Sequence, residues 1–335
     1  MLAGITIGPL TTAAAQATAP SDSVQRIRLD DSRVTEITNT PEGRQQTTSF
    51  KQRIDTNAGF SAGDVNSVKA DTFKVFAVEL PSITPAMAAR GNNKMTLVAP
   101  ADIPLSDMTL VVSSGDKSPV TAEPRVKGTS GSIWTDLQVN AKPPAVDSGE
   151  RADIGSQIAA DTYPYTYYHK CFARQYAPGW GDWVWFDHCW DFTIQKYDGN
   201  SNWNYYSMHQ FGTCKSEVST PILACGLGGQ RNGGGTISGW YGWAPKKDET
   251  SNCRSLSISV PLYGGLSMGG SYEHCETNDM NKYTEPAKFS HYWRGPVSQS
   301  DRSVEYQVSW YVPQGGAGAT FGLWSPLEIP DPPTS

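Results

Sequence analysis

The chain has 335 residues and a formal net charge of −6, with 27 Lys and Arg against 33 Asp and Glu. The charges are scattered and no long run of basic residues occurs, which argues against nucleic acid as a partner. After the first residues, no stretch reaches the ~20 apolar residues that a membrane span needs, so we expect no transmembrane segment.

Residues 1–19 have the pattern of a secretory signal peptide. Leu2–Leu10 form a short apolar run, and Ala15-Gln16-Ala17 has the small-residue form that a signal peptidase accepts. Only Met1 precedes the apolar run, so the positively charged start is missing, and a disordered tail rich in Ala and Thr is the alternative. We expect a secreted, bacterial protein with an extracellular location.

The first half of the chain divides into two parts. Residues 20–70 are polar, poor in aromatic residues and without a sustained apolar period, which predicts a disordered segment or a pro-segment. Residues 71–145 predict a small β-rich domain. Its short β-forming runs, separated by Pro and Gly, are Phe73–Leu80, Lys94–Val98, Met108–Val112 and Ile133–Val139.

The aromatic content changes near residue 150. All Tyr, His and Cys residues, and every Trp except Trp134, lie beyond residue 160. A single mixed core would not sort its residues in this way, so we predict a polar linker over 146–160 between two domains. Residues 161–329 then form an aromatic and Cys-rich β domain, and residues 330–335 form a disordered tail.

The clearest strand of the second half is Ser303–Val312. Apolar residues occupy every second position, namely Val304, Tyr306, Val308, Trp310 and Val312. Polar residues fill the positions between them, which is the period of a strand with one buried face. Gly-containing turns separate similar runs throughout this half. We therefore predict an all-β fold, a disulfide-stapled β-sandwich or barrel-like domain.

The six cysteines are even in number and none forms a C-x-x-C pair, which favours disulfides over a zinc site. Facing residues of an antiparallel hairpin have position numbers with a constant sum. Consecutive cysteines are each centred on or beside turn residues by this rule. The favoured pairs are Cys171–Cys189, Cys214–Cys225 and Cys253–Cys275. Other connectivities stay open, and we expect no metal and no cofactor.

Val184–Ile194 carries the candidate binding surface. Its even positions are mostly apolar and should face the core, whereas its odd positions place Trp beside carboxylates. Aromatic faces stack on sugar rings and neighbouring polar groups orient them, so this outer face is a candidate ligand site. The candidate residues are Tyr167, His169, Trp185, Asp187 and Asp191, together with Trp240 and Trp243 from a Gly-rich turn region. The alternative is that the Trp residues pack under loops or against the N-terminal half, with His169 and Asp191 as an ordinary cross-strand pair.

The segment Gly265–Gly269 reads Gly-Leu-Ser-Met-Gly and resembles the nucleophile elbow of α/β-hydrolase esterases. The resemblance implies Ser267 as the nucleophile, Asp279 or Asp301 as the acid and His291 as the base. It covers only these few residues. No apolar helical stripe follows the motif, and alternating βαβ units are absent upstream. The hairpin predicted for the last cysteine pair also excludes an elbow at this place.

These features favour a secreted binding protein that recognises an extracellular polymer, above all a glycan, through an aromatic surface. Two other functions stay open: a secreted hydrolase, either the serine esterase or a glycosidase, and a membrane-active β-toxin that inserts the Ser- and Gly-rich hairpin around Gly264. The sequence predicts neither the ligand nor the oligomeric state.

Overall fold

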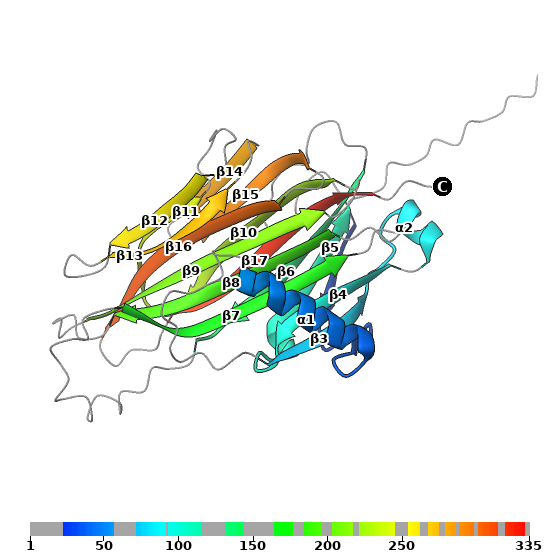
Figure 1. The fold of residues 1–335 in the computed structure, drawn as a ribbon, viewed down its shortest axis with the longest axis horizontal. Helices are drawn as coiled ribbons and strands as arrows, with labels where there is room; N and C mark the ends of the chain where they lie inside the picture. Colours follow the sequence, from blue (N-terminus) through cyan, green and yellow to red (C-terminus); the bar gives the residue numbers. More distant parts are fainter. Residues whose placement is uncertain are drawn as a thin grey trace, which may run out of the picture.

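The protein is built mainly from antiparallel β-strands (Figure 1). A computed structural model describes residues 23–56, 72–91, 93–114, 131–143, 164–176, 184–195, 203–216, 221–244, 254–261, 267–274, 279–285, 288–297, 301–313 and 319–331. In these residues the chain forms two large sheets, a separate pair of strands and two α-helices, Pro41–Thr56 (α1) and Pro85–Arg90 (α2). One 3-10 turn, Leu105–Asp107 (η1), precedes a strand of the first sheet.

Sheet A has seven strands. They are Ser23–Arg28 (β1), Met108–Ser114 (β5), Ser132–Ala141 (β6), Ile222–Gly233 (β10), Asp279–Glu285 (β14), Lys288–Val297 (β15) and Thr320–Pro330 (β17). Their order across the sheet is β1-β5-β6-β17-β10-β15-β14. The last described strand in sequence order, β17, therefore lies in the middle of the sheet, between β6 and β10.

Sheet B has eight strands. They are Val34–Glu36 (β2), Phe73–Glu79 (β3), Lys94–Pro100 (β4), Pro164–Tyr176 (β7), Val184–Gln195 (β8), Trp203–Ser216 (β9), Thr236–Ala244 (β11) and Asp301–Pro313 (β16). Their order is β11-β16-β9-β8-β7-β4-β3-β2. The all-β prediction is confirmed, and the two sheets form a sandwich-like arrangement instead of a closed barrel.

Both sheets contribute to one large apolar core. Trp310 of β16 stacks on Tyr206 of β9, with ring centroids 5.7 Å apart. Trp310 also contacts Phe321 of sheet A edge-on, at 5.0 Å between centroids, and Phe192 of β8 lies 6.0 Å from Phe321. Edge-to-face and tilted aromatic contacts add to the stability gained from area burial, so this cluster ties the two sheets together.

The alternation predicted for β8 and β16 is confirmed on the core side. The even-numbered residues of β16 from Val304 to Val312 are at most 1% exposed. The opposite face differs from the expectation of a solvated surface, because Glu305, Gln307 and Ser309 are only 3%, 2% and 5% exposed. A polar layer is thus buried on the outer face of sheet B.

Strands from both halves of the chain share the same two sheets. β6 pairs with β17 over its whole length, and β4 pairs with β7. The core also combines side chains of residues 71–145 with side chains of residues 161–329. The structure therefore corrects the predicted division into two β domains, because pairing joins the aromatic-poor strands directly to the aromatic-rich ones.

The prediction of disorder over residues 20–70 is wrong for its described part, residues 23–56. β1 pairs with β5 at the edge of sheet A, and β2 pairs with β3 at the edge of sheet B. Both are edge strands, and an edge strand needs fewer apolar residues than a central one. The signal-like residues 1–19, the linker 146–160 and the tail beyond residue 331 lie outside the described residues.

Helix α1 also escaped sequence analysis. It begins after Thr40, whose Oγ1 accepts a hydrogen bond of 3.1 Å from the Gly43 N–H, as an N-cap does. Of its 16 residues, only Phe50 and Ile54 join an apolar cluster with sheet B, so the helical period is too weak to detect. In the described part of the chain, neither helix has the length and apolar composition needed to cross a membrane.

Two disulfides join described residues, and both belong to the predicted pattern. Cys171 faces Cys189 in the β7–β8 pair, as the constant-sum rule requires. Cys214 lies in β9 and Cys225 in β10, which belong to different sheets. The second disulfide therefore ties sheet B to sheet A and does not close a hairpin, because the turn residues between its cysteines mark a crossing between sheets.

The remaining two strands, Arg254–Pro261 (β12) and Ser267–His274 (β13), pair only with each other in the described structure. Arg254 faces His274, and Pro261 faces Ser267. This register is the one predicted from the third cysteine pair. Cys253 and Cys275 themselves lie outside the described residues.

Candidate functional site

Helix α1 lies across the outer face of sheet B, over strands that carry the predicted ligand surface (Figure 1). Arg53 of α1 binds Asp187 of β8 through two contacts, with Nε 2.6 Å from Oδ2 and Nη2 3.0 Å from Oδ1. The same guanidinium lies over Trp185, 4.8 Å from the ring centroid. Asp187 is fully buried and Trp185 is 5% exposed. The expectation that these two side chains form an open ligand surface is therefore corrected: they hold α1 on the sheet.

An apolar cluster completes the contact between α1 and sheet B. Phe50 is fully buried and packs edge-on against Phe73 of β3, with ring centroids 5.1 Å apart. Cys171 and Cys189 belong to the same cluster. Of the two readings of the odd positions of β8, packing against the N-terminal half is the one that Trp185 follows.

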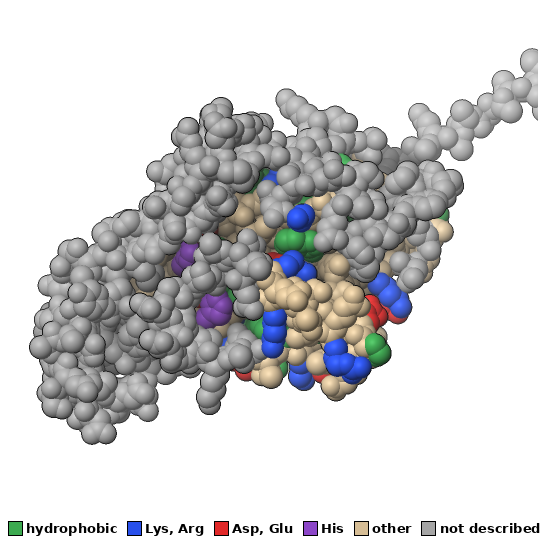
Figure 2. Space-filling model, in the orientation of Figure 1, with side chains coloured by type: hydrophobic (Ala, Val, Ile, Leu, Met, Phe, Trp, Pro, Cys, Tyr) green, Lys and Arg blue, Asp and Glu red, His purple; other side chains and the backbone are tan. Residues whose placement is uncertain are grey.

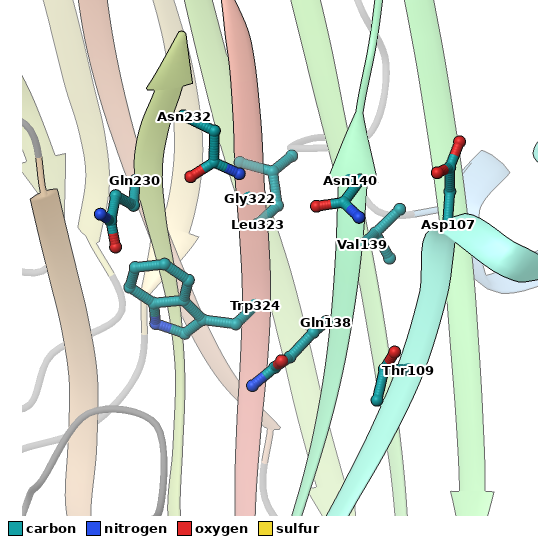
Figure 3. A pocket seen from close by; sticks show the side chains of 10 residues that line it. All are labelled: Asp107, Thr109, Gln138, Val139, Asn140, Gln230, Asn232, Gly322, Leu323 and Trp324. Carbon is teal, nitrogen blue, oxygen red and sulfur yellow. The ribbon is translucent and has the colours of Figure 1, made fainter. Parts of the chain in front are cut away.

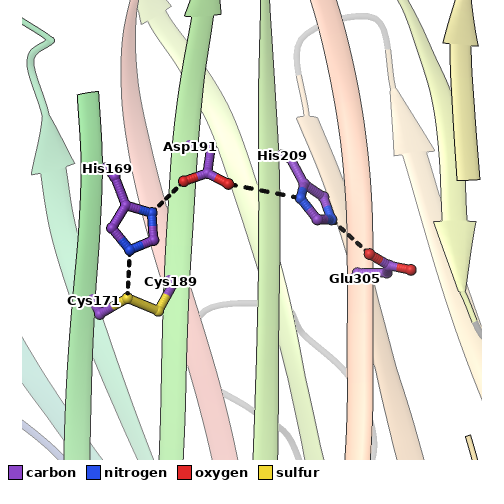
Figure 4. Close-up of polar contacts among 6 residues, drawn as sticks. All are labelled: His169, Cys171, Cys189, Asp191, His209 and Glu305. Carbon is purple, nitrogen blue, oxygen red and sulfur yellow. Dashed lines mark hydrogen bonds and ion pairs between the residues drawn. A yellow bond between two sulfur atoms is a disulfide. The ribbon is translucent and has the colours of Figure 1, made fainter. Parts of the chain in front are cut away.

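A row of alternating imidazoles and carboxylates crosses the same face of sheet B (Figure 4). His169 faces Asp191 on the neighbouring strand, as predicted, and Asp191 faces His209 of β9. A hydrogen bond joins His169 Nδ1 to Asp191 Oδ1, and the other oxygen of Asp191 lies 4.0 Å from His209 Nδ1. His209 Nε2 lies 2.5 Å from Oε2 of Glu305 on β16. Neighbouring strands thus place four ionisable groups in one line.

His209 is the centre of this row. Burial alone lowers the pKa of His209, but the hydrogen bond and charge of Glu305, together with the charge of Asp191, outweigh burial and raise it above the ordinary value. The site therefore stabilises an imidazolium between two carboxylates. The side chains of His169 and His209 are each 16% exposed, and histidine side chains reach the surface on this face of the molecule (Figure 2).

The disulfide lies at one end of the row. His169 Nε2 is 3.1 Å from Cys171 Sγ. His169, Cys171 and Cys189 place their potential metal-ligand atoms within 4.8 Å of one another. The two sulfurs are bonded to each other, however, and a metal binds thiolates. In its oxidised form this trio offers only the imidazole as a strong ligand.

Three predicted ligand residues, Tyr167, Trp240 and Trp243, have side chains outside the described part of the structure. Their backbone positions are described. Strict alternation would put Tyr167 opposite Thr193, but the register shifts at this point and Thr166 faces Thr193. Trp240 and Trp243 lie on β11, the edge strand of sheet B that pairs with β16.

The structure contradicts the esterase reading of Ser267. A nucleophile elbow connects a strand to a helix, whereas Ser267 begins β13, which pairs antiparallel with β12. Asp279 begins β14 and His291 lies in β15, so both belong to sheet A and not to the strand pair of Ser267. His291 is buried and stacks with Phe289. Regular strand pairing thus replaces the strained turn that makes an esterase serine reactive. The other candidate acid, Asp301, begins β16 in sheet B.

A groove lies on the face of sheet A that points away from the core (Figure 3). Helix α1 packs on the other sheet. The volume of the groove is about 250 Å³. Strands β6, β10 and β17 supply four side-chain amides and one indole, namely Gln138, Asn140, Gln230, Asn232 and Trp324, and Asp107 and Thr109 lie at one end. Asn140, Gln230 and Asn232 are exposed to solvent.

Trp324 forms the floor of this groove and is 6% exposed. Gly228 is its neighbour on β10, and a Cβ there would lie 1.9 Å from the indole Nε1. Glycine is therefore required for the ring to lie against the sheet. Lys288 reaches over the ring, with Nζ 5.6 Å from the centroid.

The groove has one carboxylate among its described lining residues, Asp107, and it is paired. Lys142 Nζ donates a hydrogen bond of 2.9 Å to Asp107 Oδ1. Gln138 is also part of a polar network, because its Oε1 accepts from Arg26 at 3.5 Å and its Nε2 donates to Asp136 at 3.4 Å. The groove thus presents neutral groups that can both donate and accept hydrogen bonds.

Sequence reasoning missed this groove because its residues come from strands far apart in the chain. Amides on the outer face of a strand look like ordinary solvated positions. The available signal was Trp324, a large aromatic residue at an outward position of a strand whose neighbour carries Gly228. No protein-family model matches the sequence, and a search of curated proteins finds no significant similarity. The function of this chain must therefore be argued from its own surfaces.

Proposed function

We propose that the protein is a secreted binding protein whose groove on sheet A binds carbohydrate. The observation that carries the proposal is the placement of one indole among four side-chain amides in a groove of about 250 Å³. Amides donate and accept hydrogen bonds at once, which matches the hydroxyl groups of a sugar. The indole of Trp324 is 6% exposed, so it forms the apolar floor of the groove and leaves the amides as the main recognition groups.

The charge of the groove supports a neutral ligand. The carboxylate of Asp107 is already bound by Lys142, and the ammonium of Lys288 lies over the indole of Trp324. A site for phosphate or a nucleotide gathers Arg, Lys or backbone N–H groups around the anion. Hydroxyl recognition by amides needs no such charge.

The size of the groove supports a short portion of a glycan. Pockets for small ligands start at about 300 Å³, and the groove is slightly smaller, at about 250 Å³. It therefore suits one or two sugar rings. A glycosidase needs two carboxylates across its cleft, and Asp107 is the only carboxylate among the described lining residues, which favours binding over hydrolysis.

An extracellular location is supported by the disulfides. Cys214–Cys225 joins a strand of each sheet across the core, and such a structural bond persists in oxidising compartments. The signal-like pattern of residues 1–19 agrees with export.

The groove is tested by glycan-array screening, followed by calorimetry with the best ligand. Asn140→Ala and Gln230→Ala each remove one exposed amide, and we expect each to weaken binding about five- to tenfold, since a hydrogen bond contributes roughly 1 kcal/mol. The matched control is Gln45→Ala, an exposed amide on α1 at the opposite face, which should bind as the unchanged protein does. The absence of any glycan ligand, or equal affinity in all three variants, refutes the proposal.

A further inference from the structure

The disulfide Cys171–Cys189 has an imidazole and a carboxylate aligned on one of its sulfurs (Figure 4). Cys171 and His169 are two residues apart on β7, so their side chains share a face of the sheet. Nε2 of His169 lies 3.1 Å from Cys171 Sγ, and Nδ1 of the same ring is hydrogen bonded to Asp191. The order sulfur, imidazole, carboxylate is the order in which a thiol is activated by a base that a third group holds in place.

We infer that Cys171–Cys189 is a redox-active disulfide that exchanges with small thiols, with Cys171 as the sulfur whose thiolate His169 stabilises. A thiolate is stabilised by an adjacent cationic imidazole, and a disulfide whose reduced form is stabilised is a better oxidant. Asp191 is the positioning residue, because it fixes the ring so that Nε2 points to the sulfur. This site is independent of the groove on sheet A, since it lies on the other face of the sandwich.

The direction of thiol–disulfide exchange depends on which of the two protein sulfurs is the better leaving group. A small thiolate attacks Cys189 Sγ, the bond between the two protein sulfurs breaks, and Cys171 leaves as the thiolate that faces His169. A second small thiolate then attacks the mixed disulfide, releases Cys189 as a thiolate and forms the small disulfide. The protein disulfide gains two electrons and two protons, and two small thiols lose them. A leaving thiol with a stabilised thiolate leaves faster, which selects Cys189 as the attacked sulfur.

The second disulfide lacks this arrangement and serves as an internal reference. Cys214 and Cys225 belong to the apolar core between the sheets. In the described part of the chain neither of their sulfurs contacts a histidine. The two disulfides are similarly withdrawn from solvent, because all four cysteines are at most 1% exposed. The difference between them is therefore the imidazole.

The burial of the two cysteines also limits the size of the thiol that can react with them. Cys171 and Cys189 are 1% and 0% exposed, whereas the side chain of His169, which contacts the sulfur, is 16% exposed. A folded redox protein must place its own reactive loop against a disulfide, whereas here Phe50 of α1 packs in the same cluster as both cysteines. The thiol that fits is a molecule of low molecular weight, with the size and charge of glutathione as the first probe.

The test is equilibration of the full chain in buffers of reduced and oxidised glutathione, followed by acid quenching, differential alkylation and peptide mass spectrometry. We expect Cys171–Cys189 to be half reduced at a reduced-to-oxidised glutathione ratio, [GSH]²/[GSSG], at least tenfold lower than Cys214–Cys225, a difference of about 30 mV. Half-reduction of both bonds at one ratio, or earlier reduction of Cys214–Cys225, overturns the inference. This comparison uses the unchanged protein, so it does not depend on a variant that folds.

Variants then assign the effect to the imidazole. His169→Gln should bring the ratio for Cys171–Cys189 to within about twofold of the reference bond. His209→Gln, on the same face but without a sulfur contact, should shift it less than twofold. In Cys189→Ser, the alkylation rate of Cys171 should show a thiolate forming below the ordinary thiol pKa of about 8.5, and His169→Gln in that background should abolish the shift. An unchanged pH profile, or an equal effect of the two histidine variants, refutes the role of His169.

Discussion

Several ionisable side chains of this protein are buried, among them Arg174 and Asp136. Arg174 of β7 points into the core and donates to the backbone carbonyls of Thr135 and Ser325 in sheet A, so one guanidinium connects the two sheets. Burial lowers the pKa of Arg174 to about 10, although the charge of Asp136 opposes this. Burial raises the pKa of Asp136 to about 6, although the charge of Arg174 opposes it. Each group thus weakens the desolvation penalty of the other without removing it.

The raised pKa of Asp136 makes stability depend on pH. The folded state holds the proton of Asp136 more tightly than the unfolded chain does, so the contribution of this group to stability is fully present below about pH 4 and is lost as pH rises through about 6. Asp136→Asn removes the buried charge and keeps the shape. We expect it to raise the free energy of unfolding at pH 7 by up to about 3 kcal/mol, from a shift of roughly two pH units, and to change it little at pH 3.5. Urea denaturation of both proteins at the two pH values measures this, and equal stability at pH 7 contradicts it.

The pKa of His209 is also raised in the fold, so its contribution to stability changes with pH in the same direction as that of Asp136, but at higher pH. Because it is raised in the fold, the stabilisation from Glu305 and Asp191 is fully present below about pH 6.5 and is lost as pH rises through the folded-state value. His209→Gln should therefore cost about 2 kcal/mol at pH 6, the contribution of a charged hydrogen bond, and clearly less at pH 9. Thermal or urea denaturation at both pH values checks this. A cost that is independent of pH shows that the imidazole acts by packing alone.

At the scale of elements, a small number of strong contacts hold α1 on sheet B. Phe50 supplies the apolar contact, and Arg53 supplies the ion pair with the fully buried Asp187. Breaking a buried ion pair from one side is strongly destabilising because a charge is left in a low-dielectric site. The helix therefore depends on Arg53 more than its exposed, polar sequence suggests.

Arg53→Met tests this dependence. We expect it to lower the free energy of unfolding by about 3 kcal/mol and to increase cleavage by protease within residues 41–56. Lys51→Met on the same helix is the matched control. Lys51 is exposed and lies 5.8 Å from the centroid of Phe73, so its loss should cost less than about 1 kcal/mol. Equal effects of the two variants would show that the ion pair does not hold the helix.

The contact between β10 and β17 gives a second element-scale prediction. A Cβ at Gly228 would lie 1.9 Å from the indole of Trp324, so Gly228→Ala must displace the ring. We expect a loss of about 1 to 3 kcal/mol of stability, as for overpacking, together with weaker glycan binding. Gly233→Ala on the same strand is the control, because its nearest neighbour, Thr320 Oγ1, would lie at an ordinary 3.5 Å. Denaturation and calorimetry on both variants separate the two cases.

Sequence patterns predicted individual strands and hairpins well, since these depend on local order. The alternation in β8 and β16 indicated which side chains face the core, and the cysteine positions predicted the registers of β7 with β8 and of β12 with β13. The same rule misread Cys214–Cys225, because a turn looks alike whether the chain continues in the same sheet or crosses to the other. Helix α1 was missed because an ion pair holds it where an apolar stripe would be expected.

Long-range relations were beyond the sequence. The change in aromatic content near residue 150 is real, but composition does not indicate which strands pair. The groove needs Gln138, Gln230 and Trp324 side by side, and these meet only through the pairing of β6 and β10 with β17. The sequence placed Trp185 on the correct face of β8 but predicted that this face is open to solvent. Helix α1 covers it, and α1 lies more than a hundred residues upstream in the chain.

For the whole molecule, the interleaving of the two halves predicts one cooperative unit. A fragment of residues 161–335 retains β7 and β17 but lacks β4 and β6, their partners. We expect this fragment to show no cooperative unfolding transition and to aggregate, whereas the full chain unfolds in a single step. Circular dichroism during urea titration, with size-exclusion chromatography, compares the two. A cooperative transition in the fragment would restore the separate aromatic domain.

The position of β17 has a consequence for how the protein is made. β17 separates the strand group β1-β5-β6 from the group β10-β15-β14, and these two groups do not pair with each other in the described structure. During synthesis, sheet A cannot close until residues up to about 330 have left the ribosome. Until β17 emerges, β6 and β10 each expose an unpaired edge in the middle of sheet A, which is where a nascent or truncated chain is open to wrong strand pairing.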